Sequence, residues 1–146
     1  DYAKEKAFNE GTINEDKNYC LIRMLSEKIL KDAIKNDFTQ KYIISLPESF
    51  FTKPKKYKKL ISMLDNDLIR NRINLQVTYQ EYTNHKEIIN ESINSGISFA
   101  LELDETFDNS FNILVLFKYV IVYEHLDIYD ALTEDKNAFG TTIITL

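Results

Sequence analysis

Five short apolar runs rich in β-branched residues alternate along this chain with segments of helical periodicity. The strand-like runs are residues 41–46, 72–79, 97–101, 118–124 and 141–146. Ile73, Leu75 and Val77 of the second run alternate with polar residues, a pattern typical of a strand with one buried face. No other feature of the sequence restricts the fold as much as this alternation.

The segments between the runs have the apolar spacing of amphipathic helices. In residues 20–34, the positions Leu21, Leu25, Ile29 and Ala33 recur every fourth residue and predict the buried stripe of a helix. The other predicted helical segments are 51–67 with Thr52 as N-cap, 83–96 with Thr83 as N-cap and Gly96 as the stop, 109–117, and a turn at 127–132.

Strict alternation with short connections predicts parallel strands joined by right-handed helical crossovers. Five strands are too few for a closed eight-stranded barrel, which typically needs about 250 residues. The predicted class is therefore α/β, either part of a TIM-like barrel or an open five-stranded sheet of flavodoxin-like type. The length predicts one domain over residues 1–146, and the start at Asp1 suggests a piece of a longer protein.

Charge and cysteine content narrow the classes of partner. The formal net charge of −5 disfavours nucleic acid, whose binding domains usually carry a positive surplus. Cys20 is the only cysteine, which excludes a disulfide within the chain and fits a reducing, cytoplasmic compartment. No apolar run approaches the roughly 20 residues of a membrane span, so no membrane association is expected.

Acidic residues gather at the predicted end of the third strand, and ligands bind at strand ends in α/β folds. Glu102, Asp104 and Glu105 are residues of the kind that hold a divalent cation. However, a metal site needs ligands that converge from several strands, and the neighbouring strands end mainly in amides, hydroxyls and phenols. The preferred interpretation is a solvated loop that caps the next helix through Asp108 or Asn109, with no metal and no other cofactor.

Two further constellations have simpler interpretations. Cys20 with His85 or His125 has the composition of a nucleophile and a base, but Cys20 lies on a helix, far from the predicted strand ends. The lysines within residues 53–59 could contact phosphate, but a solvated helix face is the preferred interpretation. The chain has no glycine-rich phosphate loop.

Five stretches at the predicted strands carry a family resemblance: ISLPESFF at 44–51, INLQVTYQ at 73–80, ISFALELDETFDNS at 97–110, KYVIVY at 118–123 and FGTTIITL at 139–146. They resemble strands of the EAL domain, a barrel phosphodiesterase that hydrolyses cyclic di-GMP. The third is the best match, because it follows Gly96 as the family's acidic strand follows a glycine, and it keeps Thr106 and Ser110. The resemblance covers residues 18–146 and lacks the segment with the Glu-Ala-Leu triplet and the last barrel strands.

In that family, carboxylates and an asparagine hold two divalent metals that activate water. The resemblance places Ser45 at the asparagine position and Glu102 at the position of an aspartate. The remnant pocket that it implies consists of Ser45, Gln76, Tyr79, Glu102, Leu103, Asp104, Ile121 and Tyr123, with Leu146 at a further glutamate position. Only Glu102 still offers a carboxylate at a matching position, so the resemblance implies neither a metal nor a catalytic residue.

The resemblance therefore implies a catalytically inactive EAL-like domain of a bacterial signalling protein that acts by protein–protein interaction. Its partner would be another protein or a second copy of the chain, with a cyclic dinucleotide as the less favoured ligand. The alternative is an active cyclic di-GMP phosphodiesterase, or another metal-dependent hydrolase, with a rebuilt acidic site. The residues of that rebuilt site would be Glu102, Asp104 and Glu105, assisted by Tyr79, Tyr123 and His125.

Overall fold

The computed structural model describes residues 2–34, 40–134 and 141–146, so Phe139 and Gly140 of the last similar stretch lie outside the described residues. The chain divides into two compact units, residues 1–73 and 74–146, which are described separately. The fold is α/β with five strands, of which β2 to β5 are parallel, and this confirms the predicted class. The single domain remains a prediction.

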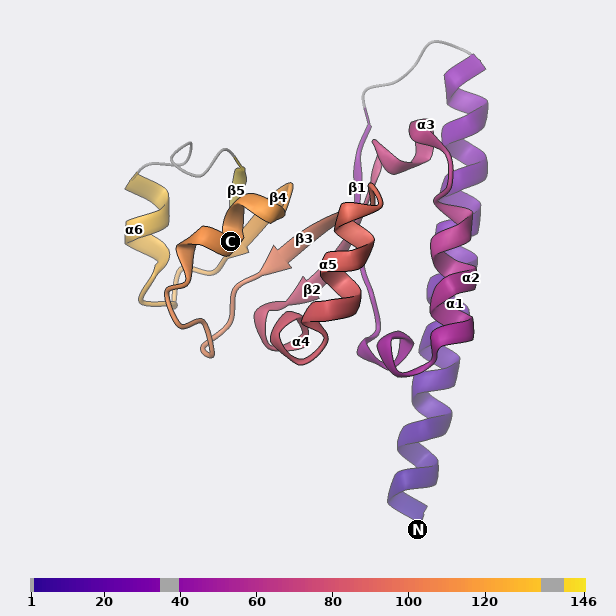
Figure 1. Ribbon diagram of the computed structural model, residues 1–146, viewed down its shortest axis with the longest axis horizontal. Coiled ribbons are helices and arrows are strands. Elements are labelled where there is room, and N and C mark those ends of the chain that lie inside the picture. The colour runs from indigo at the N-terminus through magenta and orange to yellow at the C-terminus, as the bar shows by residue number, and fades with distance from the viewer. Residues whose placement is uncertain (1, 35–39, 135–140) are drawn as a thin grey trace. The chain divides into compact units, whose positions relative to one another are not determined.

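The first unit contains one long helix, one strand and three short helical segments (Figure 1). They are α1 (Tyr2–Ile34), β1 (Tyr42–Ser45), η1 (Glu48–Thr52), α2 (Pro54–Met63) and α3 (Asp67–Arg70). The second unit contains nearly all of β2 and every later element. These elements are β2 (Ile73–Thr78), α4 (Tyr79–Asn84), α5 (Lys86–Asn94), β3 (Ser98–Glu102), η2 (Phe111–Leu116), β4 (Tyr119–Val122), α6 (Tyr129–Glu134) and β5 (Thr142–Thr145).

Helix α1 begins well before the predicted residue 20, and its buried face coincides only in part with the predicted stripe. Ile22 and Ile29 are buried as expected of apolar residues, but Leu21 is 44% exposed. The remaining buried positions of this face are polar: Glu15, Asn18 and Ser26. Ile29 belongs to both faces, and the centre of the buried face is turned by about 40° from that of the predicted stripe.

Polar contacts within the first unit explain the orientation of α1. The side-chain amide of Asn18 donates to the carbonyl of Ser45 at 2.7 Å, and the Glu15 carboxylate lies 2.7 Å from the ammonium of Lys53. Both partners come from segments more than 25 residues further along the chain. Helical periodicity in 20–34 cannot reveal such contacts, so the predicted stripe was wrong at Leu21.

The second predicted helix is divided into shorter pieces. Thr52 does not cap α2, since its hydroxyl donates to the carbonyl of Ser49 and the N-cap residue is Lys53. Pro54 occupies the first turn as expected, because proline there loses no helical hydrogen bond. Asn66 caps α3 by accepting from two backbone N–H groups of its first turn.

Strands β2 to β5 form a parallel arrangement in which each strand lies beside its successor in sequence (Figure 1). In the register, Thr78 is paired with Glu102, and Glu102 with Ile121. Phe99, Ala100 and Leu101 of β3 are consecutive and all buried. Burial of consecutive residues means that both faces of β3 are covered, as is usual for parallel strands.

The helical connection between β2 and β3 starts earlier than predicted. Thr78 caps α4 in a capping box with Glu81, whereas Thr83 lies inside the helix. His85 separates the two helices, since it is the C-cap residue of α4 and the N-cap residue of α5. Gly96 follows α5 with φ of 103°, a conformation that glycine adopts without steric cost, which confirms its predicted role as the stop.

Candidate functional site at the ends of strands β2, β3 and β4

The Glu102 carboxylate lies at the centre of a hydrogen-bonded group at the ends of three adjacent strands. The Tyr123 hydroxyl of the β4 end donates to one carboxylate oxygen at 2.6 Å. The side-chain amide of Gln76, from β2, donates to the other oxygen at 3.4 Å. The register accounts for this meeting, because Gln76 is paired with Ala100, two residues before Glu102, and Glu102 is paired with Ile121, two residues before Tyr123. Residues two apart on a strand point to the same face, so the three side chains share one face of adjacent strands.

The bond between Tyr123 and Glu102 also changes the acidity of the phenol. The hydrogen bond to the negative carboxylate favours the neutral phenol, and it raises the pKa of Tyr123 above its ordinary value. Partial burial acts in the same direction. Tyr123 is therefore a proton-retaining donor to Glu102 at neutral pH.

Two positions of the predicted remnant pocket belong to the apolar core. Leu103 and Ile121 are both buried, and the N–H of Leu103 donates to the carbonyl of Ile121 at 2.9 Å. Neither side chain carries an atom that can bind a metal or transfer a proton. Their contribution to this edge is packing.

Both oxygens of Asp104 are occupied by contacts to neighbouring segments. One oxygen accepts from the backbone N–H and the hydroxyl of Thr106, the former at 2.9 Å. The other accepts from the backbone N–H of Gln80, in the first turn of α4, at 3.0 Å. Asp104 therefore connects the loop after β3 to the beginning of α4. Its carboxylate lies at the N-terminus of that helix, where a negative charge is favourable.

Asp108 makes a similar local turn and holds Tyr79. It accepts from the N–H of Ser110 at 3.1 Å, from the Ser110 hydroxyl, and from the Tyr79 hydroxyl at 2.8 Å. The hydrogen bonds from Ser110 and then Tyr79 lower the pKa of Asp108. Burial, followed by the bond to Asp108, raises the pKa of Tyr79. The prediction that Asp108 or Asn109 caps the next helix was wrong, because Ser110 is the N-cap residue of η2 and makes no side-chain cap bond.

The role of Asp108 was missed in the sequence, but a local signal for it exists. Asp104 with Thr106 and Asp108 with Ser110 repeat one pattern, an aspartate followed two residues later by a hydroxyl residue. In both, the carboxylate accepts from the backbone N–H and the hydroxyl two residues on. Such turns are a common preference of aspartate, serine and threonine. The contacts of Asp104 with Gln80 and of Asp108 with Tyr79 join distant positions, and no local sequence pattern predicts them.

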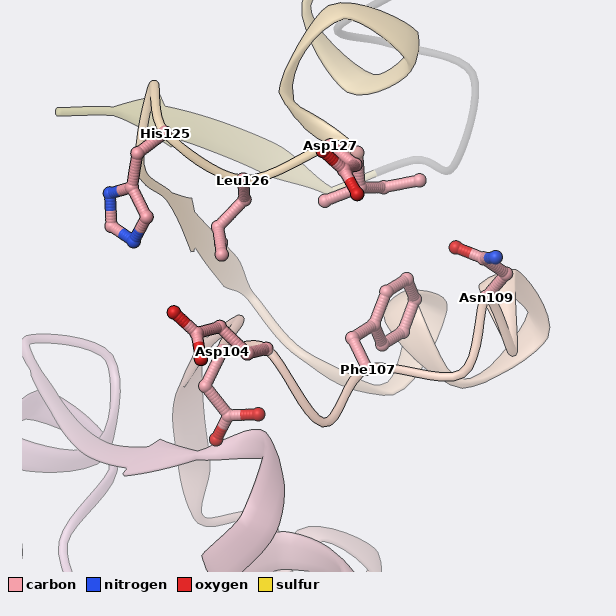
Figure 2. A pocket seen from close by; sticks show the side chains of 8 residues that line it. Asp104, Phe107, Asn109, His125, Leu126 and Asp127 are labelled. Carbon is pink, nitrogen blue, oxygen red and sulfur yellow. The ribbon is translucent and has the colours of Figure 1, made fainter.

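A cavity of about 350 Å³ opens between the loop after β3 and the loop after β4 (Figure 2). An adjoining hollow of about 330 Å³ shares Asp104, Glu105, His125 and Leu126 with it. The His125 ring lies 5.8 Å from the Tyr123 ring, centroid to centroid. Among the described residues, the lining of both hollows includes carboxylates and no lysine or arginine.

The structure brings together only part of the predicted site. Gln76, Glu102 and Tyr123 form one group, and Asp104 and Tyr79 are joined to the same edge through their own partners. Ser45 belongs to the first unit, where it is exposed and accepts from Asn18 through its backbone carbonyl. The remaining predicted position is Leu146, whose side chain is 63% exposed at the end of the chain.

Over residues 2–34, 40–134 and 141–146, no three histidine, cysteine or acidic side chains are grouped so that they could hold a metal ion. In the same part of the chain, no helix combines the length and the apolar character needed to cross a membrane.

Comparisons with known proteins add no family assignment. No family model matches the chain, and the searches of curated proteins and of solved structures found no significant match.

Proposed function

We propose that this chain is a catalytically silent, EAL-like domain of a bacterial signalling protein, in the cytoplasm, and that it acts by binding a protein. The fold supports this proposal through the order of its strands. In β2 to β5 each strand lies beside its sequence neighbour, which is the order of a barrel. A flavodoxin-like sheet would instead insert its first strand between the second and third.

The observation that carries the proposal is the state of Glu102. This is the one carboxylate at a position matching the family's metal ligands, and its two oxygens accept hydrogen bonds from Tyr123 and Gln76. A two-metal site uses several carboxylates to hold ions about 4 Å apart. The neighbouring positions Leu103 and Ile121 are buried apolar residues, so no second ligand joins Glu102 there.

The charge of the two hollows argues against a cyclic dinucleotide as ligand. Their described lining contains Glu102, Asp104, Glu105 and Asp127 and no lysine or arginine. A cyclic dinucleotide carries two phosphodiester charges, and proteins bind such groups with arginine, lysine or a metal. Without a cation, the two sets of negative charge repel each other.

The test is calorimetric titration of the protein with Mn²⁺ and Mg²⁺, together with an assay for hydrolysis of cyclic di-GMP. We expect no saturable binding of two ions per chain and no turnover. Tyr123→Phe serves as a matched variant, because it frees one oxygen of Glu102, and we expect it to remain inactive. Turnover of cyclic di-GMP that is lost in Glu102→Gln would overturn the proposal.

A second candidate function is a metal-dependent hydrolase with a rebuilt acidic site. The observation in its favour is the cavity in which Asp104, Glu105, His125 and Asp127 line a common space (Figure 2). Glu105 and His125 are exposed and are residue types that bind metals, but the described side chains are not grouped as metal ligands, so an ion would have to draw them together. In the titration above, one tight Mn²⁺ site that survives Glu102→Gln but disappears in Glu105→Gln would favour this candidate.

A further inference from the structure

Helix α1 presents an apolar surface on the side opposite its packed face. Nine large hydrophobic residues are exposed in the described part of the chain, and five of them are on α1. Met24 is 67% exposed, Ile13 53% and Leu21 44%. We name Ile13, Cys20, Leu21 and Met24 the outer face of α1. These three large apolar side chains lie within about three turns of α1, and a helix that faces only water does not require them.

The outer face is free of the rest of the first unit. Glu15, Ile22 and Ile29 are buried on the other side, where α1 packs against η1, α2 and α3. At 100° per residue, Met24 lies about 160° around the helix from Ile22. A second helix can therefore lie along the outer face without displacing any of these elements.

The exposed positions of α1 have the spacing of a coiled-coil seam. Steps of four and three residues connect Ile13, Lys17, Cys20, Met24, Glu27, Lys31 and Ile34, and all seven are exposed. Alternating steps of four and three keep one side of a helix facing a partner helix. The seam is apolar at its centre and charged on both sides of it, so the charges decide which partner and which orientation fit.

A second copy of α1 fits this seam in the antiparallel direction. A parallel pair would stack Lys17 on Lys17 and Glu27 on Glu27, which is repulsive. An antiparallel pair centred on residue 22 places Lys17 opposite Glu27 of the partner copy, and Cys20 opposite Met24 of the partner copy. Ile13 is opposite Lys31 of the partner copy, so the apolar contact is confined to the centre of the seam. The two Leu21 side chains then meet at the two-fold axis. The interface is self-complementary, as a two-fold dimer requires.

One pair of like charges remains near the axis in this arrangement. The two Arg23 side chains approach each other there, but each lies 3.6 Å from Glu27 of its own helix. Glu27 thus faces Arg23 on one side and the partner's Lys17 on the other. The alternation of charge across the axis offsets the repulsion between the arginines.

We propose that the chain forms a two-fold dimer through antiparallel pairing of the outer faces of α1, with a second copy as the partner. The inference rests on the proposed function as a binding domain, because it names the partner. The two fail separately: a monomer that does not hydrolyse cyclic di-GMP overturns only the dimer, and a dimer that does hydrolyse it overturns only the silent domain.

Sedimentation velocity over a range of protein concentrations tests the dimer. We expect a concentration-dependent shift from monomer to dimer in the native chain. The midpoint is the protein concentration at which half of the chains are dimeric. Met24→Glu should raise this concentration at least tenfold, because it places a charge in the centre of the seam. Val115→Glu is the matched control, since Val115 is 59% exposed on η2 of the second unit, and it should leave the midpoint unchanged.

Charge reversal tests the pairing across the axis. Lys17→Glu alone should weaken the dimer, because it sets Glu against Glu27 of the partner copy. The double variant Lys17→Glu with Glu27→Lys should dimerise more tightly than Lys17→Glu alone, since the attraction across the axis is reversed in sign but kept. It should not reach the native midpoint, because Glu27 no longer offsets the charge of Arg23. Equal weakening in the double variant would contradict the proposed register.

Disulfide formation under mild oxidation distinguishes the two orientations. The native chain, with Cys20, is mixed with the double variant Cys20→Ser with Met24→Cys. In the antiparallel register only the mixed pair brings two thiols opposite each other, and two Cys20 residues lie about 10 Å apart, beyond disulfide reach. We expect the mixed disulfide alone. Cross-linking of the native chain with itself would indicate a parallel pair, and a monomer at all concentrations would overturn the dimer.

Discussion

At the scale of single residues, two tyrosines at the same edge of the structure retain their protons for different reasons. The Tyr123 pKa is raised mainly by the bond to Glu102, and the Tyr79 pKa mainly by burial, then by Asp108. A raised pKa means that the folded protein holds the proton more tightly than the unfolded chain. Each tyrosine therefore adds stability that is present below about pH 10 and is lost as the pH rises through its folded-state pKa.

Substitution of the two carboxylates should separate these effects. We expect Glu102→Gln to lower the pKa of Tyr123 toward its ordinary value and to leave that of Tyr79 unchanged. Asp108→Asn should lower the pKa of Tyr79 only in part, because burial remains. Titration of the individual tyrosine rings by NMR measures both. A Tyr123 pKa that does not respond to Glu102→Gln would show that the hydrogen bond is not its main cause.

At the scale of the elements, α1 shows that two neighbouring residues of one helix can have opposite surroundings. Ile22 is buried against the first unit, and Leu21 lies on the outer face. Loss of a buried aliphatic side chain removes apolar burial and leaves a cavity, which together cost about 2–5 kcal/mol. Loss of an exposed one costs little in the monomer.

The paired substitutions Ile22→Ala and Leu21→Ala test this difference. We expect Ile22→Ala to lower the free energy of unfolding by about 3 kcal/mol, and Leu21→Ala to lower it by less than about 1 kcal/mol. Denaturant unfolding of both variants, at a concentration where the native chain is monomeric, measures the two values. A larger loss of stability in Leu21→Ala than in Ile22→Ala would mean that Leu21 is buried, as the sequence predicts, and does not belong to an exposed outer face.

At the scale of the whole molecule, the strands of the second unit differ in how well they are enclosed. Strand β3 is hydrogen-bonded to β2 on one side and to β4 on the other, and its residues 99–101 are buried. Strand β5 pairs with β4, and Ile143 is the only one of its four residues that is buried. Openings that expose an edge strand cost less free energy than those that expose a central one.

Hydrogen exchange followed by mass spectrometry or NMR should show this difference. We expect the amides of β3 to exchange at least tenfold more slowly than those of β5, whose hydrogen bonds to β4 open first. The β4 amides that are bonded toward β3 serve as the internal reference. Equal protection of β3 and β5 would mean that the second unit opens only as a whole.

Local sequence determined much of the secondary structure. All five strands lie within one or two residues of their predicted runs, because β-branched alternation and turn residues act over a few positions. The stop at Gly96 follows from its backbone freedom alone. In contrast, the predicted helix at 83–96 began too late and missed α4, since the capping box at Thr78 was not recognised.

Only the tertiary structure decided the role of each polar side chain. Whether Glu102 is open to a ligand depends on Tyr123 and Gln76, which are 21 and 26 residues away and reach it through the register of three strands. Asn18 and Glu15 are buried because residues of β1 and the start of α2 offer them partners. Sequence periodicity reports which residues share a face of one element. The partners of a polar group are set by how separate elements meet, and this determines whether the group is a ligand or part of the framework.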